Sequence, residues 1–120
     1  MNQTLYQRLR EAEGIRLLVD DVMAAHLANP LIKTRFENIK DLERAKRMAR
    51  EFFGAGAGGP APYTGKDMVA AHTGMNISEQ EYLAATDDIL GAMDKHHYDE
   101  ETKKDVLAII YSLKNHIMRK

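Results

Sequence analysis

The 120-residue sequence contains no cysteine, so the chain can form neither a disulfide framework nor a metal site with thiolate ligands. An excess of positive charge is also absent, because 17 Lys and Arg face 18 Asp and Glu. This balance argues against a protein that binds nucleic acid through bulk positive charge. No apolar run approaches the roughly 20 residues that span a bilayer, and the polar N-terminus is unlike a signal peptide. We therefore expect a cytoplasmic protein with no nucleic-acid or membrane partner.

Large aromatic side chains are scarce as well. Tryptophan is absent, and the chain has five Tyr and three Phe, whereas Met occurs seven times. Flexible thioethers fill irregular spaces in a core that lacks large rings. The length fits one domain over residues 1–120. The composition raises the hypothesis of a core built around a group that is not a side chain.

Hydrophobic periodicity predicts helices along almost the whole chain, and period-2 alternation typical of strands is missing. The clearest apolar stripe, with steps of three and four residues, covers residues 11–28 and ends at Asn29-Pro30. Further helices are predicted at 31–36, 42–55, 66–73, 79–96 and 99–118. Asp41, Ser78 and Asp99 are the expected N-caps of three of them. The predicted fold class is all-α.

The middle of the chain is unusual for a small helical protein. Residues 54–65 form a long glycine-rich connection, and the short helix after it carries a lone histidine, His72. A histidine opposite a helix rich in Phe is suited to holding a flat cofactor, although an ordinary loop and a surface histidine are the simpler interpretation. The adjacent His96 and His97 do not share a helix face, and no His pair has the spacing of a zinc enzyme.

The residues around this connection resemble a group I truncated haemoglobin. The resemblance rests on EFF at 51–53, GGPAPYTG at 58–65, Met68 and AHTG at 71–74, and it extends over nearly the whole chain. It implies a two-over-two helical sandwich around one haem b (iron protoporphyrin IX). It also implies that His72 is the proximal ligand of the iron, as imidazole is in globins. The expected ligands are the small gases O2, CO and NO.

The resemblance implies further haem contacts. Phe36, Phe52 and Phe53 would pack on the distal side, and Phe53 falls where the family places a tunnel-gating aromatic. Arg44 and Tyr63 would approach the propionates. Residues expected to line the proximal and buried faces are Met68, Ile77, Val106 and Ile110. The alternative is that the phenylalanines are plain core and that Arg44 is a solvated surface residue.

The sequence departs from the family where bound oxygen is usually held. The position of a distal tyrosine reads Met23, and the opposing helix presents Ala45, Met48 and Ala49. A hydrogen-bond donor in a dry pocket stabilises bound oxygen by about 1–3 kcal/mol, so its absence predicts weak oxygen binding. NO or redox chemistry then becomes the expected use, with a possible reductase partner. The missing donors disfavour an NO dioxygenase, which needs a stabilised oxygen complex, and the lack of a visible distal acid–base residue disfavours a peroxidase. Enzyme activity of the NO dioxygenase, NO reductase or peroxidase type is therefore left open.

Three other hypotheses remain open. Met48 could be a sixth iron ligand, which would make a His/Met haem protein for electron transfer or for redox or gas sensing, and Lys46 is a further candidate ligand. His116 lies close to where some family members attach a haem vinyl group covalently. Finally, the chain could be a globin-fold interaction module that has lost its haem. The expected assembly is a monomer or a weak dimer.

Overall fold

The structure is a computed structural model that describes residues 3–120. Its helices, in chain order, are α1 (Leu5–Arg8), α2 (Glu11–Ala28), α3 (Lys33–Glu37), α4 (Leu42–Gly56), α5 (Met68–His72), α6 (Glu79–Lys95) and α7 (Glu100–Ile117). Within the described residues the only β pairing is an isolated bridge between Ile77 and Met118. No helix in residues 3–120 is both long and apolar enough to cross a membrane.

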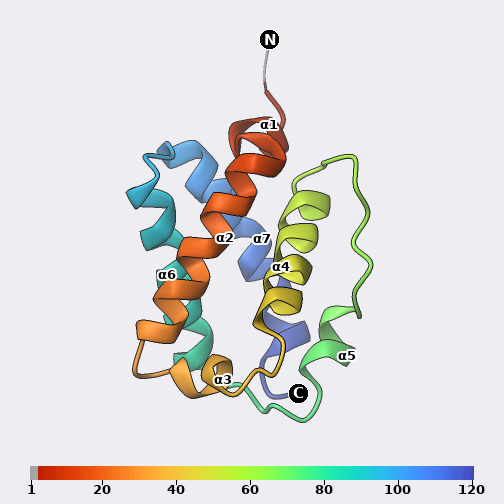
Figure 1. The fold of residues 1–120 in the computed structure, drawn as a ribbon, viewed down its shortest axis with the longest axis vertical. Helices are drawn as coiled ribbons and strands as arrows, with labels where there is room; N and C mark the ends of the chain where they lie inside the picture. Colours follow the sequence, from red (N-terminus) through yellow and green to blue (C-terminus); the bar gives the residue numbers. More distant parts are fainter. Residues whose placement is uncertain (1–2) are drawn as a thin grey trace.

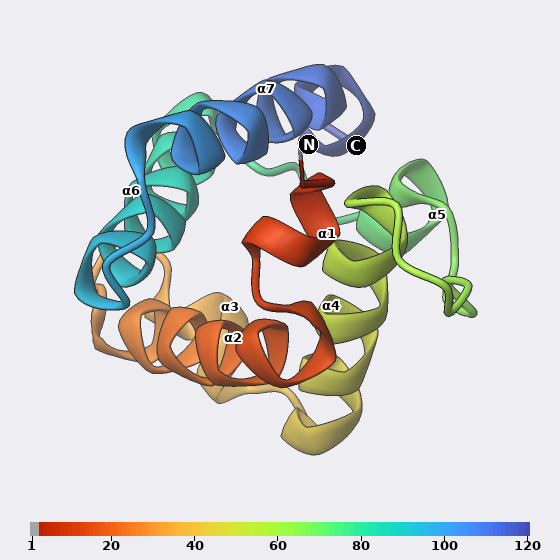
Figure 2. The same ribbon diagram turned by 90° about the horizontal axis from the view of Figure 1, so that it is seen from above.

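The four long helices form two pairs. Helix α2 packs on α4, α6 packs on α7, and α2 also packs on α6 (Figure 1). Seen from above, α2, α6, α7 and α4 follow one another around the molecule, and α1 lies near the middle of the view (Figure 2). The short helix α5 contacts α7. It lies at the edge of the group of four long helices (Figure 1). The predicted all-α, two-over-two architecture is therefore confirmed.

The helix ends are set by the side chains that the sequence indicates. The Asp41 carboxylate accepts a hydrogen bond from the backbone N–H of Arg44 at 3.0 Å, and the Asp99 carboxylate accepts one from Thr102 at 2.8 Å. Ser78 and Glu81 form a reciprocal capping box at the start of α6. These bonds satisfy amide donors that have no partner inside a helix, so three of the predicted helix starts are confirmed.

The glycine-rich connection begins later than predicted, because α4 continues through Gly54 to Gly56. Helix α1 was not predicted, and it docks on the end of α4 through a 3.1 Å bond from the Tyr6 amide to the Ala57 carbonyl. Gly59 is required at this point, since an added Cβ would lie 2.6 Å from the Tyr6 ring. This tertiary contact extends α4 in spite of the low helix propensity of its glycines.

The connection between α1 and α2 has an unfavourable backbone. Arg10 and Glu11 have φ angles of 69° and 61°, in the left-handed region that favours glycine. The Arg10 guanidinium lies 4.2 Å from the centre of the Tyr98 ring, a cation–π contact that ties this turn to the core.

Candidate functional site

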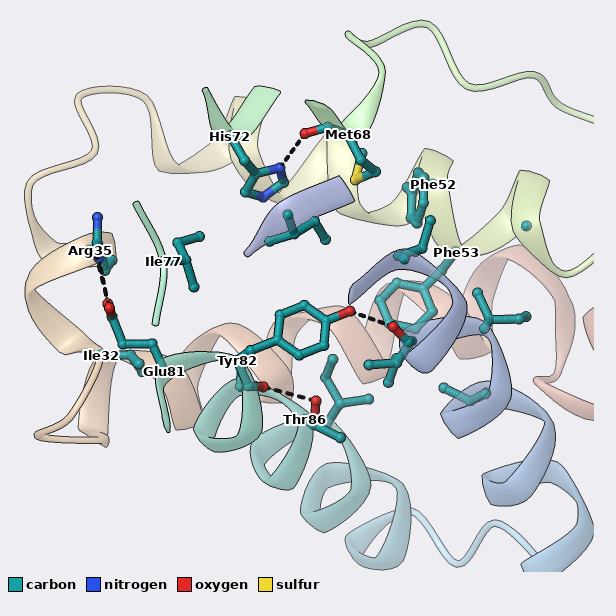
Figure 3. Close-up of a pocket in the computed structure, with 18 of the residues that line it drawn as sticks. Ile32, Arg35, Phe52, Phe53, Met68, His72, Ile77, Glu81, Tyr82 and Thr86 are labelled. Atoms are coloured by element: carbon teal, nitrogen blue, oxygen red, sulfur yellow. Dashed lines mark hydrogen bonds and ion pairs between the residues drawn. The ribbon is translucent and has the colours of Figure 1, made fainter. Parts of the chain in front are cut away.

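A large cavity, with a volume of about 520 Å³, lies between α3, α4, α5, α6 and α7 (Figure 3). This volume falls within the range of about 300–1,000 Å³ that is typical of sites for small molecules and cofactors. Its wall is mostly aliphatic and aromatic. It is lined by Leu9, Ile32, Arg35, Phe36, Ile39, Phe52, Phe53, Gly56, Ala57, Met68, His72, Met75, Ile77, Glu81, Tyr82, Ala85, Thr86, Ile89, Val106, Ile109, Ile110, Leu113 and Ile117.

His72 is the one histidine in this wall, and it lies at the end of α5. Its Nδ1 atom is 2.8 Å from the carbonyl oxygen of Met68, one helical turn earlier (Figure 3). Because a carbonyl only accepts, Nδ1 must carry the ring proton, and Nε2 then carries the free lone pair. Within residues 3–120, Nε2 has no hydrogen-bond partner in the protein. The imidazole is thus arranged as a metal ligand is.

Two hydroxyl groups of α6 also lie in the wall, but both donate to backbone carbonyls. The Tyr82 hydroxyl donates to the carbonyl of Ile110 on α7, and the Thr86 hydroxyl donates to the carbonyl of Tyr82 at 2.9 Å (Figure 3). Burial raises the pKa of the Tyr82 phenol, so it stays protonated. These polar groups are satisfied within the wall itself.

The remaining charged groups form a paired cluster at one end of the cavity (Figure 3). The guanidinium of Arg35 on α3 donates from Nε and Nη2 to the two carboxylate oxygens of Glu81, at 2.6 and 3.1 Å. Its Nη1 atom donates to the carbonyl of Met75 at 2.8 Å. The hydrogen bond from Arg35 lowers the pKa of Glu81 from its usual 4.5 to about 2. The pair joins α3 to the start of α6.

The cavity brings together a majority of the residues proposed from the sequence. Those that line it are His72, Phe36, Phe52, Phe53, Met68, Ile77, Val106 and Ile110. Those that do not line it are Met23, Arg44, Ala45, Met48, Ala49 and Tyr63.

The residues outside the wall lie in varied surroundings. Met23 is buried in α2, Arg44 is exposed on α4, and Met48 is half-buried on the same helix. The Tyr63 hydroxyl donates to the carbonyl of Lys66 at 2.7 Å, and the Tyr63 ring packs edge-on against Phe52. His116 is exposed on α7, although the next residue, Ile117, lines the cavity.

Sequence reasoning missed the contribution of α6. Five of its residues face the cavity at steps of one, three or four positions, and they are Glu81, Tyr82, Ala85, Thr86 and Ile89. This spacing marks one face of a helix, so the periodicity could have revealed it. The stripe carries polar groups and small side chains, which weakened the hydrophobic signal.

The cavity does not offer the donor set of a free metal ion. Within residues 3–120 no group of three or more His, Asp or Glu side chains is placed to hold a metal. One imidazole in a large apolar cavity instead fits a cofactor that brings its own equatorial ligands and its own apolar surface.

Comparison with known proteins agrees with this geometry. The model of the bacterial-like globin family matches residues 4–119. The chain is 31% identical to a group 1 truncated hemoglobin of Tetrahymena pyriformis, over 88% of this chain and 95% of that protein. The crystal structure of the T. pyriformis protein in its Fe(III) form is similar in fold, with a TM-score of 0.93, 23% identity and coverage of 98% of this chain and 100% of that one.

A second solved structure has the same fold. The 2/2 hemoglobin of a Synechococcus species, crystallised in the cyanomet state with covalently attached heme, has a TM-score of 0.85 and 21% identity. The match covers 93% of this chain and 94% of that one. The family match over almost the full length and the helical arrangement lead to the same conclusion: the chain belongs to the bacterial-like globin family, among its group 1 truncated haemoglobins.

Proposed function

We propose that this chain binds one haem b in the cavity through His72 and takes O2, CO or NO as ligand. The observation that carries the proposal is the orientation of His72, whose Nδ1 is fixed by the Met68 carbonyl while Nε2 is free in an apolar cavity. Family membership implies haem and gas binding in general. When bound, the haem supplies an iron with one coordination position left for a small molecule.

The other cavity residues would hold the cofactor and exclude water. Phe36, Phe52 and Phe53 offer aromatic surface, and Ile110 and Val106 offer aliphatic surface. Burial of apolar area contributes about 25 cal/mol per Å², so a porphyrin in this cavity stabilises the folded chain. This accounts for a sequence with few large side chains of its own.

The proposed pocket stabilises bound oxygen only weakly. Tyr82 and Thr86 carry the hydroxyl groups of the cavity wall, and both donate to carbonyl groups. A donor that is already engaged contributes little to a partly negative bound oxygen. We therefore propose that the protein serves NO or redox chemistry rather than oxygen storage, with a reductase to return the iron to its ferrous state.

Absorption spectra of the ferric, ferrous and carbonyl forms test the proposal. Protein expressed with haem supplied should bind it in a one-to-one ratio and form a carbonyl complex, and stopped-flow mixing should record fast release of oxygen. A colourless protein under these conditions would instead favour an interaction module without haem. Slow release of oxygen would contradict the weak stabilisation, though not the haem site.

A further inference from the structure

The inference concerns a histidine behind the cavity wall. His26, in the last turn of α2, is 6% exposed. Its Nδ1 atom lies 2.8 Å from a carboxylate oxygen of Asp88 on α6, and the Asn29 amide donates to both oxygens of that carboxylate at 3.2 Å. Burial lowers the pKa of His26, an effect that the bond to Asp88 opposes. The neutral ring then donates its Nδ1–H to Asp88, which fixes the plane of the imidazole.

The fixed imidazole stacks on a residue that forms the cavity. The ring centroids of His26 and Phe36 are 4.6 Å apart, with an angle of 26° between the planes. Phe36 belongs to α3 and lines the cavity, whereas His26 does not. The order of contacts is therefore Asp88, His26, Phe36 and then the proposed haem.

Helix α3 depends on such side-chain contacts for its position. It has five residues, and its N-cap, Ile32, makes no side-chain capping bond. An isolated helix of this length is not stable in water. Two side chains of α3 make such contacts: Arg35 pairs with Glu81 on α6, and Phe36 stacks on His26 of α2. His26 is in turn bonded to Asp88 on α6. The stack of Phe36 on His26 is the contact that involves an aromatic ring of the cavity wall.

We propose that His26 is a positioning residue of the haem site: anchored by Asp88, it holds the Phe36 ring in the cavity wall. The proposal rests on the haem-binding function proposed above. Without the stacked imidazole, Phe36 can turn away from the cavity, and water then has access to the cofactor. Loss of haem from the protein should therefore become faster.

Three variants separate the parts of this arrangement. His26→Asn keeps a donor near the position of Nδ1 but removes the ring, and His26→Phe keeps a ring but removes the donor. Asp88→Asn weakens the anchor without a change in size. The matched control is His96→Asn, because His96 also bonds an aspartate between the same two helices, Asp21 at 2.5 Å, and does not line the cavity.

The measurements are the rate of haem transfer to an excess of apomyoglobin and, separately, the free energy of unfolding of each apoprotein. We expect His26→Asn to speed haem transfer roughly 2- to 10-fold, the range for loss of one aromatic stack. His26→Phe should speed it less, Asp88→Asn should change it in the same direction, and His96→Asn should leave it unchanged. In a Phe36→Leu background, His26→Asn should produce no further increase.

The outcomes distinguish this proposal from the function on which it rests. A wild-type protein that holds no haem overturns the proposed haem site. A haem-loaded wild type in which His26→Asn leaves the transfer rate unchanged, or speeds it equally with and without Phe36, overturns the positioning role alone. A rise in transfer rate that simply follows the loss of apoprotein stability across all variants, His96→Asn included, also overturns it.

Discussion

The Nδ1 atom of His72 and the carbonyl oxygen of Met68 lie 2.8 Å apart, and this one hydrogen bond decides which ring nitrogen can bind a metal. It keeps the proton on Nδ1 and leaves Nε2 with a lone pair in the cavity. The partner is a neutral carbonyl rather than a carboxylate. The hydrogen bond at Nδ1 therefore places no negative charge beside the imidazole.

The first prediction removes the imidazole that we propose as the iron ligand. His72→Gly should abolish the normal ferrous spectrum, because no other histidine lines the cavity within the described residues. Added imidazole should restore the spectrum, since the space left by the side chain can hold the free ring. The control is His116→Gly, which removes an exposed imidazole outside the cavity and should leave the spectrum unchanged. An unaltered spectrum in His72→Gly would contradict the assignment.

His116 also bears on how the haem is held. Its side chain is exposed, while the neighbouring Ile117 faces the cavity. His116 itself does not line the cavity. We therefore expect acid–acetone to extract all haem and the pyridine haemochrome spectrum to show two intact vinyl groups. Haem that resists extraction in the wild type but not in His116→Gly would support a covalent bond.

The long helices and their caps could be predicted from sequence because each signal is local. Asp41, Ser78 and Asp99 cap helices whose amides lie three residues further along the chain, so short-range pattern is enough. The position of the candidate site was inferred from the lone His72 after the glycine-rich connection. That inference needed the resemblance to a known family, because a single histidine has many possible roles.

The rest of the site depends on contacts between distant parts of the chain. Arg35 and Glu81, or His26 and Asp88, are brought together by the packing of α2 on α6 and of α3 on α2, which no local pattern indicates. Family resemblance likewise pointed to Arg44, whereas the cavity wall contains Arg35. Sequence spacing predicts which residues share a helix face, but not which helix that face meets.

A third prediction concerns Met48 as a possible sixth ligand. In the structure Met48 does not line the cavity, so we expect Met48→Ala to leave the ferric spectrum unchanged. A low-spin ferric spectrum whose sulfur-to-iron band vanishes in Met48→Ala would contradict this expectation and establish a His/Met haem. The control is Met68→Leu, which removes a different thioether. Met68 lines the cavity and belongs to the same short helix as His72.

A fourth prediction concerns acid stability. The Arg35 hydrogen bond lowers the pKa of Glu81 to about 2 in the folded chain, below its ordinary value of 4.5. A depressed carboxylate pKa stabilises the fold above the unfolded value, and this stability is lost as pH falls from about 4.5 toward 2. Both side chains are partly exposed, at 29% and 19%, so we expect Arg35→Gln to cost about 1 kcal/mol at neutral pH.

Urea unfolding between pH 2 and pH 7 measures the free energy of unfolding and so checks the expected loss of stability. Arg35→Gln should show a shallower fall in stability below pH 4.5 than the wild type, because Glu81 then titrates closer to its ordinary pKa. The matched control is Arg16→Gln, which breaks an arginine–glutamate pair with side chains that are 47% and 69% exposed. The control should barely change the curve, and equal effects of the two variants would refute a special role for the Arg35 pair.

The last prediction uses the strained backbone at the start of α2. Glu11 has a φ of 61°, where an L side chain is unfavourable by roughly 1–2 kcal/mol. At an ordinary helical position glycine is about 1 kcal/mol less stable than alanine, but at this φ the order should reverse. We expect Glu11→Gly to be about 1 kcal/mol more stable than Glu11→Ala in urea unfolding. Both variants remove the same carboxylate, so their difference isolates the backbone effect, and an Ala variant at least as stable as the Gly variant would show that the turn carries no such strain.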